Sequence, residues 1–152
     1  MAKRKVLDKI YMNIAREVST LSRCNRNKVG CVIVKDNNIL SMGYNGTPTG
    51  MDNKCEDEQT DEYLNNIGVH KINYTTKWYV LHAESNAIAK MARTINACEG
   101  ATLYTTMSPC KECAKLIIQA GIKEVVFKEL YDTDSETPLD LLHQCNIQTK
   151  YE

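Results

Sequence analysis

Strand-like and helix-like segments alternate in the second half of the chain, and this alternation limits the folds that the chain can adopt. "GATLYTTM" at 100–107 and "KEVVFKEL" at 123–130 are rich in β-branched and apolar residues, as strands are. Between them, "CKECAKLIIQAG" at 110–121 has helical spacing and is closed by Gly121. A strand, a helix and a second strand in this order are typical of a crossover unit.

The first half of the chain combines one helix with a β-hairpin. From about Lys5 to Ser22, apolar residues recur at three and four positions, which predicts an amphipathic helix. In residues 28–46, two apolar-rich runs are joined by Asp36-Asn37-Asn38, whose residue types favour a tight turn. We therefore expect two antiparallel strands here.

The middle of the chain has weaker signals. From Thr47 to Lys77 the periodicity is poor and Pro, Gly, Asp and Asn are frequent, so we expect a long excursion with at most a short helix near Asp61 to Ile67. A helix from about Ala83 to Asn96 follows. The tail from Ser135 to Tyr151 predicts a last helix and a possible short strand.

Together these elements predict an α/β fold, a three-layer sandwich around a mixed sheet of about five strands. With 152 residues, 43% of them hydrophobic, the chain can bury a single core. No internal repeat suggests a second unit, so we expect one domain spanning residues 1–152.

Charge and cysteine content narrow the class of protein. Lysine plus arginine and aspartate plus glutamate number 19 each, so the net charge gives no general attraction to nucleic acid or to an anionic membrane. Neither a signal peptide nor the roughly 18 apolar residues of a membrane helix is present, so we expect a soluble cytoplasmic protein. Its seven cysteines, an odd number, are then expected to be reduced thiols.

Two short fragments carry the chemistry. "YVLHAESNAI" at 79–88 contains His82 and Glu84, and "MSPCKECAKL" at 107–116 contains Cys110 and Cys113 at a helix start. Catalytic zinc commonly has three His or Cys ligands and a fourth position open to water, and His82, Cys110 and Cys113 would supply such a set. Glu84 is better suited to proton transfer beside that water.

Each fragment alone has another interpretation. A Cys-x-x-Cys pair can be a redox dithiol or half of a structural zinc site, and His-x-Glu occurs by chance. A non-catalytic zinc module would use the same ligands, but it requires a fourth protein ligand and leaves Glu84 without a role. Together the fragments match the H-x-E…P-C-x-x-C pattern of zinc nucleobase deaminases, which favours a catalytic zinc.

The chain resembles the cytidine and deoxycytidylate deaminase superfamily, and within it the dCMP deaminases. The resemblance is carried by residues 28–57, 78–92 and 100–127, about half of the chain, and is looser over the first helix and the tail. It implies a cytidine deaminase-like fold and zinc-dependent hydrolysis of dCMP to dUMP and ammonia, which supplies the precursor of dTMP. Other zinc deaminases, acting on free cytidine, tRNA adenosine or a pterin-like base, share the signature; the neutral charge favours a free nucleotide over RNA.

The resemblance also assigns roles around the cytosine ring. Activated water would attack C4 while Glu84 protonates N3 and then the departing amine. Asn45 matches an asparagine that binds the sugar, and Ser108 lies beside the ring. Tyr131 matches a site tyrosine, with packing at the edge of the core as the alternative.

The substrate phosphate requires a cation. Arg23, Arg26 and Lys28 form a local basic cluster, and a guanidinium can donate two hydrogen bonds to a phosphate. Arg26 and Lys28 are our candidates, either for the substrate phosphate or for that of a regulatory nucleotide. A solvated loop is the alternative.

Regulation is implied by the resemblance alone. In dCMP deaminases the loop matching residues 43–50 is part of a site at a subunit interface, where dCTP with Mg²⁺ activates and dTTP inhibits. The matching residues here are Gly43, Tyr44, Asn45, Gly46 and Arg93, although helical spacing alone would place Arg93 on the surface. The resemblance further implies a homo-oligomer, a hexamer.

Cys24, Cys55 and His70 raise the question of a second, structural zinc, which some family members bind in this region. The chain lacks the extra histidines that those relatives have just before the His-x-Glu motif. We therefore expect Cys24 and Cys55 to be a reduced, partly buried thiol pair.

Overall fold

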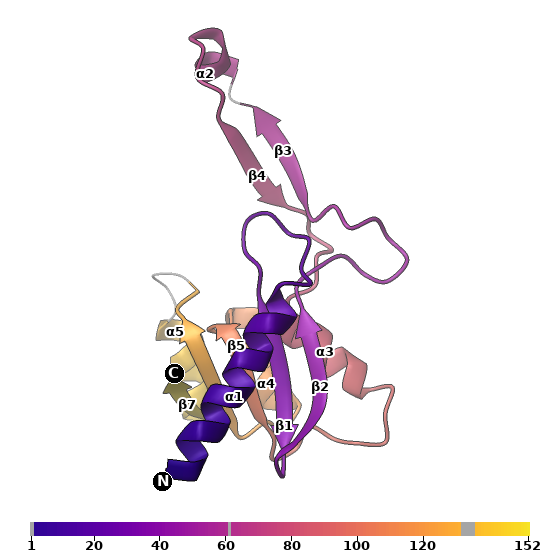
Figure 1. Cartoon of the computed structure of the whole chain (residues 1–152), viewed down its shortest axis with the longest axis vertical. Helices are drawn as coiled ribbons and strands as arrows, with labels where there is room; N and C mark the ends of the chain where they lie inside the picture. The colour runs from indigo at the N-terminus through magenta and orange to yellow at the C-terminus, as the bar shows by residue number, and fades with distance from the viewer. Residues whose placement is uncertain (1, 61, 132–135) are drawn as a thin grey trace.

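The computed structural model describes residues 2–60, 62–131 and 136–152 (Figure 1). None of the helices in these ranges is both long and apolar enough to cross a membrane. The elements are, in chain order, α1 (Ala2–Ser19), β1 (Gly30–Lys35), β2 (Asn38–Tyr44), β3 (Glu56–Thr60), α2 (Glu62–Asn66), β4 (Ile72–Thr76), α3 (Ala83–Met91), β5 (Thr102–Met107), α4 (Lys111–Gln119), β6 (Glu124–Glu129), α5 (Glu136–Gln144) and β7 (Gln148–Tyr151).

Five strands form a mixed sheet in the order β2-β1-β5-β6-β7. Strand β1 is antiparallel to both β2 and β5, whereas β5, β6 and β7 are parallel. Helices α4 and α5 make the crossovers between the parallel strands, as the alternation in the sequence predicts. The predicted mixed sheet of about five strands is confirmed.

Helices cover the two faces of the sheet separately. Helix α1 lies on one face, where it packs against Val32, Val34 and Tyr104, and helices α3, α4 and α5 lie on the other (Figure 1). Successive residues of β1 alternate between the layers, because Cys31 and Ile33 belong to the core under α3 and α4. The three-layer prediction is therefore confirmed.

The hairpin β1–β2 turns at Asp36 and Asn37, which have positive φ values of 50° and 61°. A two-residue turn with this backbone matches the twist of the strands, and Asp and Asn tolerate the left-handed region better than most residues. Asn38 already pairs with Lys35 as part of β2, so the turn is one residue shorter than the predicted Asp36-Asn37-Asn38.

Two predicted helices end elsewhere. The first helix covers Ala2–Ser19 rather than Lys5 to Ser22, and residues 20–22 continue it as tighter turns in which each N–H binds the carbonyl three residues back. Helix α3 ends at Met91 rather than Asn96, because Arg93 and Thr94 form turns of the same kind.

The prediction for Thr47 to Lys77 was wrong in part: residues 47–55 contain no helix or strand, but two strands follow them. Strands β3 and β4 pair in register as a second hairpin that projects from the body of the protein (Figure 1). Helix α2 at its tip corresponds to the short helix predicted near Asp61 to Ile67, although Asp61 itself lies outside the described residues.

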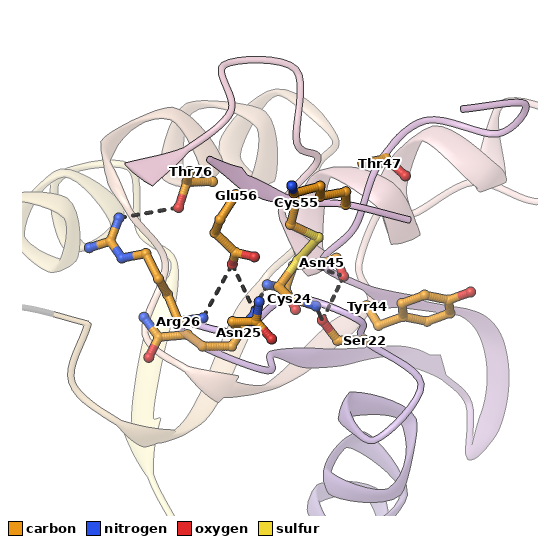
Figure 2. The surroundings of a disulfide bond; sticks show 12 residues. Ser22, Cys24, Asn25, Arg26, Tyr44, Asn45, Thr47, Cys55, Glu56 and Thr76 are labelled. Carbon is orange, nitrogen blue, oxygen red and sulfur yellow. Dashed lines mark hydrogen bonds between the residues drawn. A yellow bond between two sulfur atoms is a disulfide. The ribbon is translucent and has the colours of Figure 1, made fainter. Parts of the chain in front are cut away.

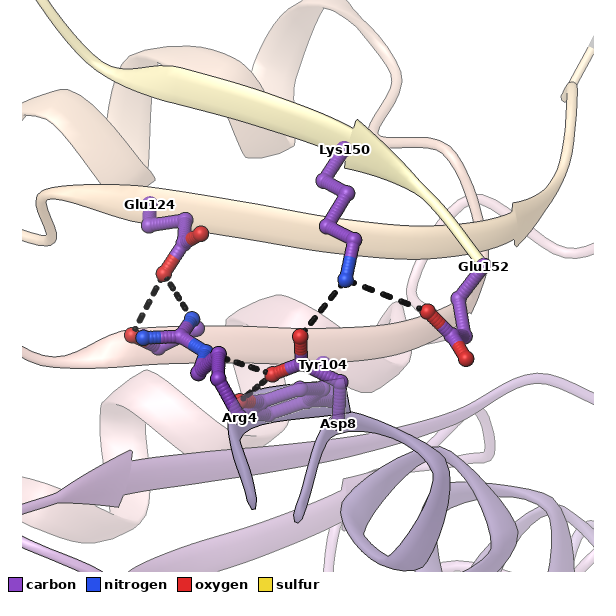
Figure 3. Close-up of polar contacts among 7 residues, drawn as sticks. Arg4, Asp8, Tyr104, Glu124, Lys150 and Glu152 are labelled. Atoms are coloured by element: carbon purple, nitrogen blue, oxygen red, sulfur yellow. Dashed lines mark hydrogen bonds and ion pairs between the residues drawn. The ribbon is translucent and has the colours of Figure 1, made fainter. Parts of the chain in front are cut away.

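A buried carboxylate joins the two ends of the chain to the middle of the sheet (Figure 3). Asp8 of α1 is fully buried; it accepts hydrogen bonds from Tyr104 of β5 (2.7 Å), Lys150 of β7 (2.6 Å) and Arg4 (2.8 Å). Burial alone would raise the pKa of Asp8, but these donors outweigh it and the pKa is lowered. Arg4 also pairs with Glu124 of β6.

Candidate active site

Two helix starts bring the predicted metal ligands together. His82 and Cys110 occupy the N-cap positions of α3 and α4, with extended backbones and side chains that make no capping hydrogen bond. Cys113 lies in the first turn of α4. The side chains of His82 and Cys110 are therefore available to bind a shared partner instead of capping their own helices.

The spacing of the three side chains fits a tetrahedral ion. His82 Nδ1 lies 3.4 Å from Cys110 Sγ and 3.5 Å from Cys113 Sγ, and all three ligand atoms lie within 4.8 Å of one another. Zinc with bonds of about 2.3 Å to sulfur and about 2.0 Å to nitrogen requires a sulfur–nitrogen separation of about 3.5 Å. Within the described ranges this is the one group of three such residues that could hold a metal.

The electrostatics of the group favour a cation. Hydrogen bonds from Cys113 and then from His82 lower the pKa of Cys110 to about 3, which favours its thiolate form. The Cys110 thiolate raises the pKa of His82, and hydrogen bonding to Cys110 together with burial raises the pKa of Cys113. A divalent cation would take the place of the protons between these three side chains.

Glu84 lies in the first turn of α3, beside the ligand group. Its side chain is 4% exposed, and Cys113 Sγ lies 3.6 Å from Glu84 Oε2. Burial raises the pKa of Glu84 to about 7. A carboxyl group that exchanges its proton near neutral pH is suited to general acid–base chemistry.

His82, Glu84 and Cys110 line a pocket of about 610 Å³, a volume that includes its open mouth. Arg26, Asn45, Ser108 and Tyr131 all line it, so the structure brings these candidates to one place. Lys28 is exposed and is not among the lining residues.

Asn45 also braces the loop that carries Arg26. Its Oδ1 accepts a hydrogen bond from the Val29 N–H (2.8 Å), and its Nδ2 donates to the Asn27 carbonyl (2.8 Å). A primary amide has two N–H donors and two acceptor lone pairs, so one of each is left for a ligand.

Ser108 acts on the pocket indirectly. It is buried, and its Oγ accepts a hydrogen bond from the Tyr131 N–H (2.8 Å), while its own N–H donates to the Glu129 carbonyl (2.7 Å). Ser108 therefore fixes where the chain turns after β6, and Tyr131 lies at the pocket with its side chain half-exposed.

Two of the residues predicted to form a regulatory site line different pockets. Asn45 lines the pocket described above, whereas Tyr44 lines a separate groove with Lys90 and Thr94, and Lys90 Nζ lies 5.6 Å from the centre of the Tyr44 ring. Arg93 is exposed in the turn after α3. Gly43 has a packing role, since a Cβ atom there would lie 2.2 Å from the Ala83 carbonyl oxygen.

Several lining residues were not predicted. Thr76 and Val80 come from the end of the second hairpin and the segment after it, where no motif points to them.

Cys24 and Cys55 form a disulfide, so the prediction that they are a reduced thiol pair was wrong (Figure 2). The two cysteines are 31 residues apart in the sequence, so nothing in their spacing indicates that they are neighbours in the fold. His70, the third residue of that prediction, is exposed.

Comparison with known proteins agrees with this geometry. Residues 5–129 match the cytidine and deoxycytidylate deaminase zinc-binding region. The chain is 37% identical to the deoxycytidylate deaminase of Enterobacteria phage T4, covering 90% of this chain and 85% of that protein, and 38% identical to the human deoxycytidylate deaminase, covering 87% and 71%. The crystal structure of a dCMP deaminase from cyanophage S-TIM5 in complex with dCMP and dUMP superposes with a TM-score of 0.79 at 36% identity, covering 95% of both chains. The chain belongs to the zinc-binding cytidine and deoxycytidylate deaminase family.

Proposed function

We propose that this protein is a zinc-dependent dCMP deaminase, which converts dCMP and water to dUMP and ammonia. One observation carries the proposal: His82, Cys110 and Glu84 line a pocket together with Arg26 and Asn45, and Cys113 completes the group of metal ligands beside His82. The relatives named deoxycytidylate deaminase and the cyanophage complex with dCMP and dUMP support the same substrate.

The ligand set fits zinc, as the donor types and distances require. His82, Cys110 and Cys113 would hold the zinc, which would lower the pKa of a bound water to about 7. Glu84 would take a proton from this water and deliver it to N3 while the water oxygen bonds to C4. It would then carry the second proton to the exocyclic amine as the C4–N4 bond breaks and ammonia leaves.

The sugar and the phosphate of the nucleotide would lie in the part of the pocket that is farther from Glu84. Asn45 would bind the sugar with its remaining N–H and lone pair, and Tyr131 would contact the ring from the position that Ser108 gives it. Arg26 would bind the 5′-phosphate, because it is the arginine that lines the pocket. Lys28, outside the lining, would add long-range attraction only.

We further propose that the single domain assembles into a homo-oligomer, a hexamer by resemblance, in the cytoplasm. Regulation by dCTP or dTTP, each with Mg²⁺, would then use Gly43, Tyr44, Asn45, Gly46 and Arg93 across a subunit interface. Tyr44 and Asn45 line different pockets within one chain, which is compatible with a regulatory site that a neighbouring subunit completes.

A deamination assay tests the substrate. The zinc-loaded protein is given dCMP, CMP, deoxycytidine and dCTP, each with and without added dCTP or dTTP, and its oligomeric state is measured by light scattering. We expect dCMP to have the highest kcat/KM, because a bound phosphate contributes binding energy that the nucleoside lacks. Preference for deoxycytidine or cytidine would assign the protein to a different branch of the family, and a monomer indifferent to both triphosphates would remove the regulatory part alone.

A further inference from the structure

Two different contacts tie the loop that carries Arg26 to the root of the second hairpin (Figure 2). The first is the Cys24–Cys55 disulfide. The second is the carboxylate of Glu56, whose Oε1 accepts hydrogen bonds from the N–H groups of Asn25 (2.9 Å) and Arg26 (3.2 Å). The three consecutive loop residues 24–26 are thus held by the two consecutive residues 55 and 56.

Burial sets this contact apart from the rest of the hairpin. Glu56 is 2% exposed, Cys24 2% and Cys55 1%, whereas residues 57–60 of β3 and all of β4 are exposed. A carboxylate is costly to bury unless hydrogen bonds replace its water. Glu56 accepts hydrogen bonds from the two loop N–H groups, so this conformation of the loop stabilises its burial.

The cross-strand pair of the hairpin that contains Glu56 also holds the Arg26 side chain. Glu56 pairs with Thr76 across β3 and β4, and Thr76 Oγ1 accepts a hydrogen bond from the Arg26 guanidinium (3.2 Å). The backbone and the side chain of Arg26 are therefore both fixed by one strand pair. Figure 2 shows the guanidinium extended toward Thr76, which lines the pocket together with Arg26.

We propose that Glu56 and the Cys24–Cys55 disulfide are positioning elements for phosphate binding: they hold Arg26 at the pocket in the conformation that takes the 5′-phosphate. The proposal rests on the proposed function. Holding a loop in its bound conformation removes the ordering cost from binding, so loss of either tie weakens binding of the phosphorylated substrate. The ligand group around His82 and Glu84 is not part of the tie, so the chemistry itself is unaffected.

The disulfide makes this positioning sensitive to the redox state. A phosphine reductant gives two electrons to the sulfur–sulfur bond and becomes a phosphine oxide by taking the oxygen of one water molecule. The two protons of that water convert Cys24 and Cys55 to thiols. Glu56 remains as the second tie. Reduction is therefore expected to weaken phosphate binding by less than loss of both ties.

Substitutions at Glu56 test the carboxylate. We expect Glu56→Ala to raise KM for dCMP about tenfold with kcat within about twofold, and to leave kcat/KM for deoxycytidine unchanged. Glu56→Gln keeps an acceptor oxygen and should restore most of the affinity. Glu58→Ala, which removes an exposed carboxylate from the same strand, is the control. Equal losses with dCMP and deoxycytidine, or no loss with either, would overturn the proposal.

A readout without turnover separates this proposal from the function. Trypsin cuts after Arg23, Arg26 and Lys28 only when the loop opens, so we expect cutting at least about fivefold faster in Cys55→Ser and in phosphine-treated protein. Cys145→Ser removes an exposed free thiol and serves as the control. If dCMP is not a substrate, the function fails while the cutting rates still report on the loop; unchanged rates would refute the ties.

Discussion

Glu84 combines two properties that proton transfer in this reaction requires. It lies next to the ligand group, 3.6 Å from Cys113 Sγ, and its burial raises its pKa to about 7. A carboxylate in water, with a pKa of about 4.3, would be a weaker base toward the attacking water and would hold the proton only briefly before the amine leaves. Both properties come from its place in the first turn of α3, two residues after His82.

Glu84→Gln should therefore separate binding from chemistry. The amide keeps the size of the side chain but cannot move a proton, so we expect kcat to fall by about 10²–10⁴-fold while one zinc per chain and dCMP affinity remain. Metal analysis and single-turnover kinetics measure both. Glu112→Gln, which changes an exposed carboxylate between the two cysteines, is the control. Near-normal turnover in Glu84→Gln would mean that another group transfers the proton.

The motif residues could be predicted from the sequence because their spacing is local. His82 with Glu84, and Cys110 with Cys113, each lie within one helical turn, and both pairs are at a helix start. The support that Ser108 gives to Tyr131 could not be predicted in this way, since it joins residues 23 positions apart. The roles of Glu56 and of the disulfide depend on contacts between loops that have no periodic signal.

At the scale of elements, the β1–β2 hairpin was predictable and the β3–β4 hairpin was not. Strand β1 is buried and apolar, so its residue types identify it. In β3, only Glu56 is buried, and β4 is exposed on both faces, so neither strand has the alternation of apolar and polar residues that marks a half-buried strand. Pairing of exposed strands leaves little trace in the sequence.

Gly43 determines how closely α3 approaches β2. A Cβ atom at this position would lie 2.2 Å from the Ala83 carbonyl oxygen and 2.6 Å from the Ala87 nitrogen, both of which are backbone atoms. Because a backbone cannot yield as a side chain can, the helix would have to move. Helix α3 begins directly after His82 and contains Glu84, so its displacement also disturbs the ligand group.

We expect Gly43→Ala to lower the free energy of unfolding by about 1–3 kcal/mol, the usual cost of an overpacked contact. Zinc affinity should fall as well, because His82 moves with the helix. Denaturant unfolding and a competition assay with a zinc chelator measure these effects. Gly46→Ala is the control for stability, since its added Cβ would meet no atom closer than 3.9 Å. Equal stability of the two variants would show that α3 can shift without cost.

At the scale of the whole molecule, two cores lie on opposite faces of one sheet, and Asp8 connects the helix on one face with the sheet. One core lies under α1 and the other under α3, α4 and α5. Asp8 of α1 is bonded to Tyr104 in the middle of the sheet and to Lys150 on its last strand (Figure 3). The sequence predicts the layers from apolar spacing, but it does not predict this contact, which spans 142 positions.

Asp8→Asn should therefore destabilise the whole fold. The amide removes the negative charge facing Arg4 and Lys150, and we expect the free energy of unfolding to fall by about 2–3 kcal/mol. This is less than for a fully buried pair, because both cations are partly exposed.

The effect depends on pH. The folded pKa of Asp8 lies below the ordinary 3.8, so between these two pKa values the unfolded chain binds more protons than the folded one. The advantage of the unsubstituted protein is thus fully present above about pH 4 and is lost as the pH falls through the folded pKa. Urea unfolding of both proteins from pH 7 to pH 3 measures the difference, with Asp57→Asn, whose carboxylate is 67% exposed, as the control. A difference that stays constant to pH 3, or one no larger than that of Asp57→Asn, would show that the Asp8 charge does not hold the layers together.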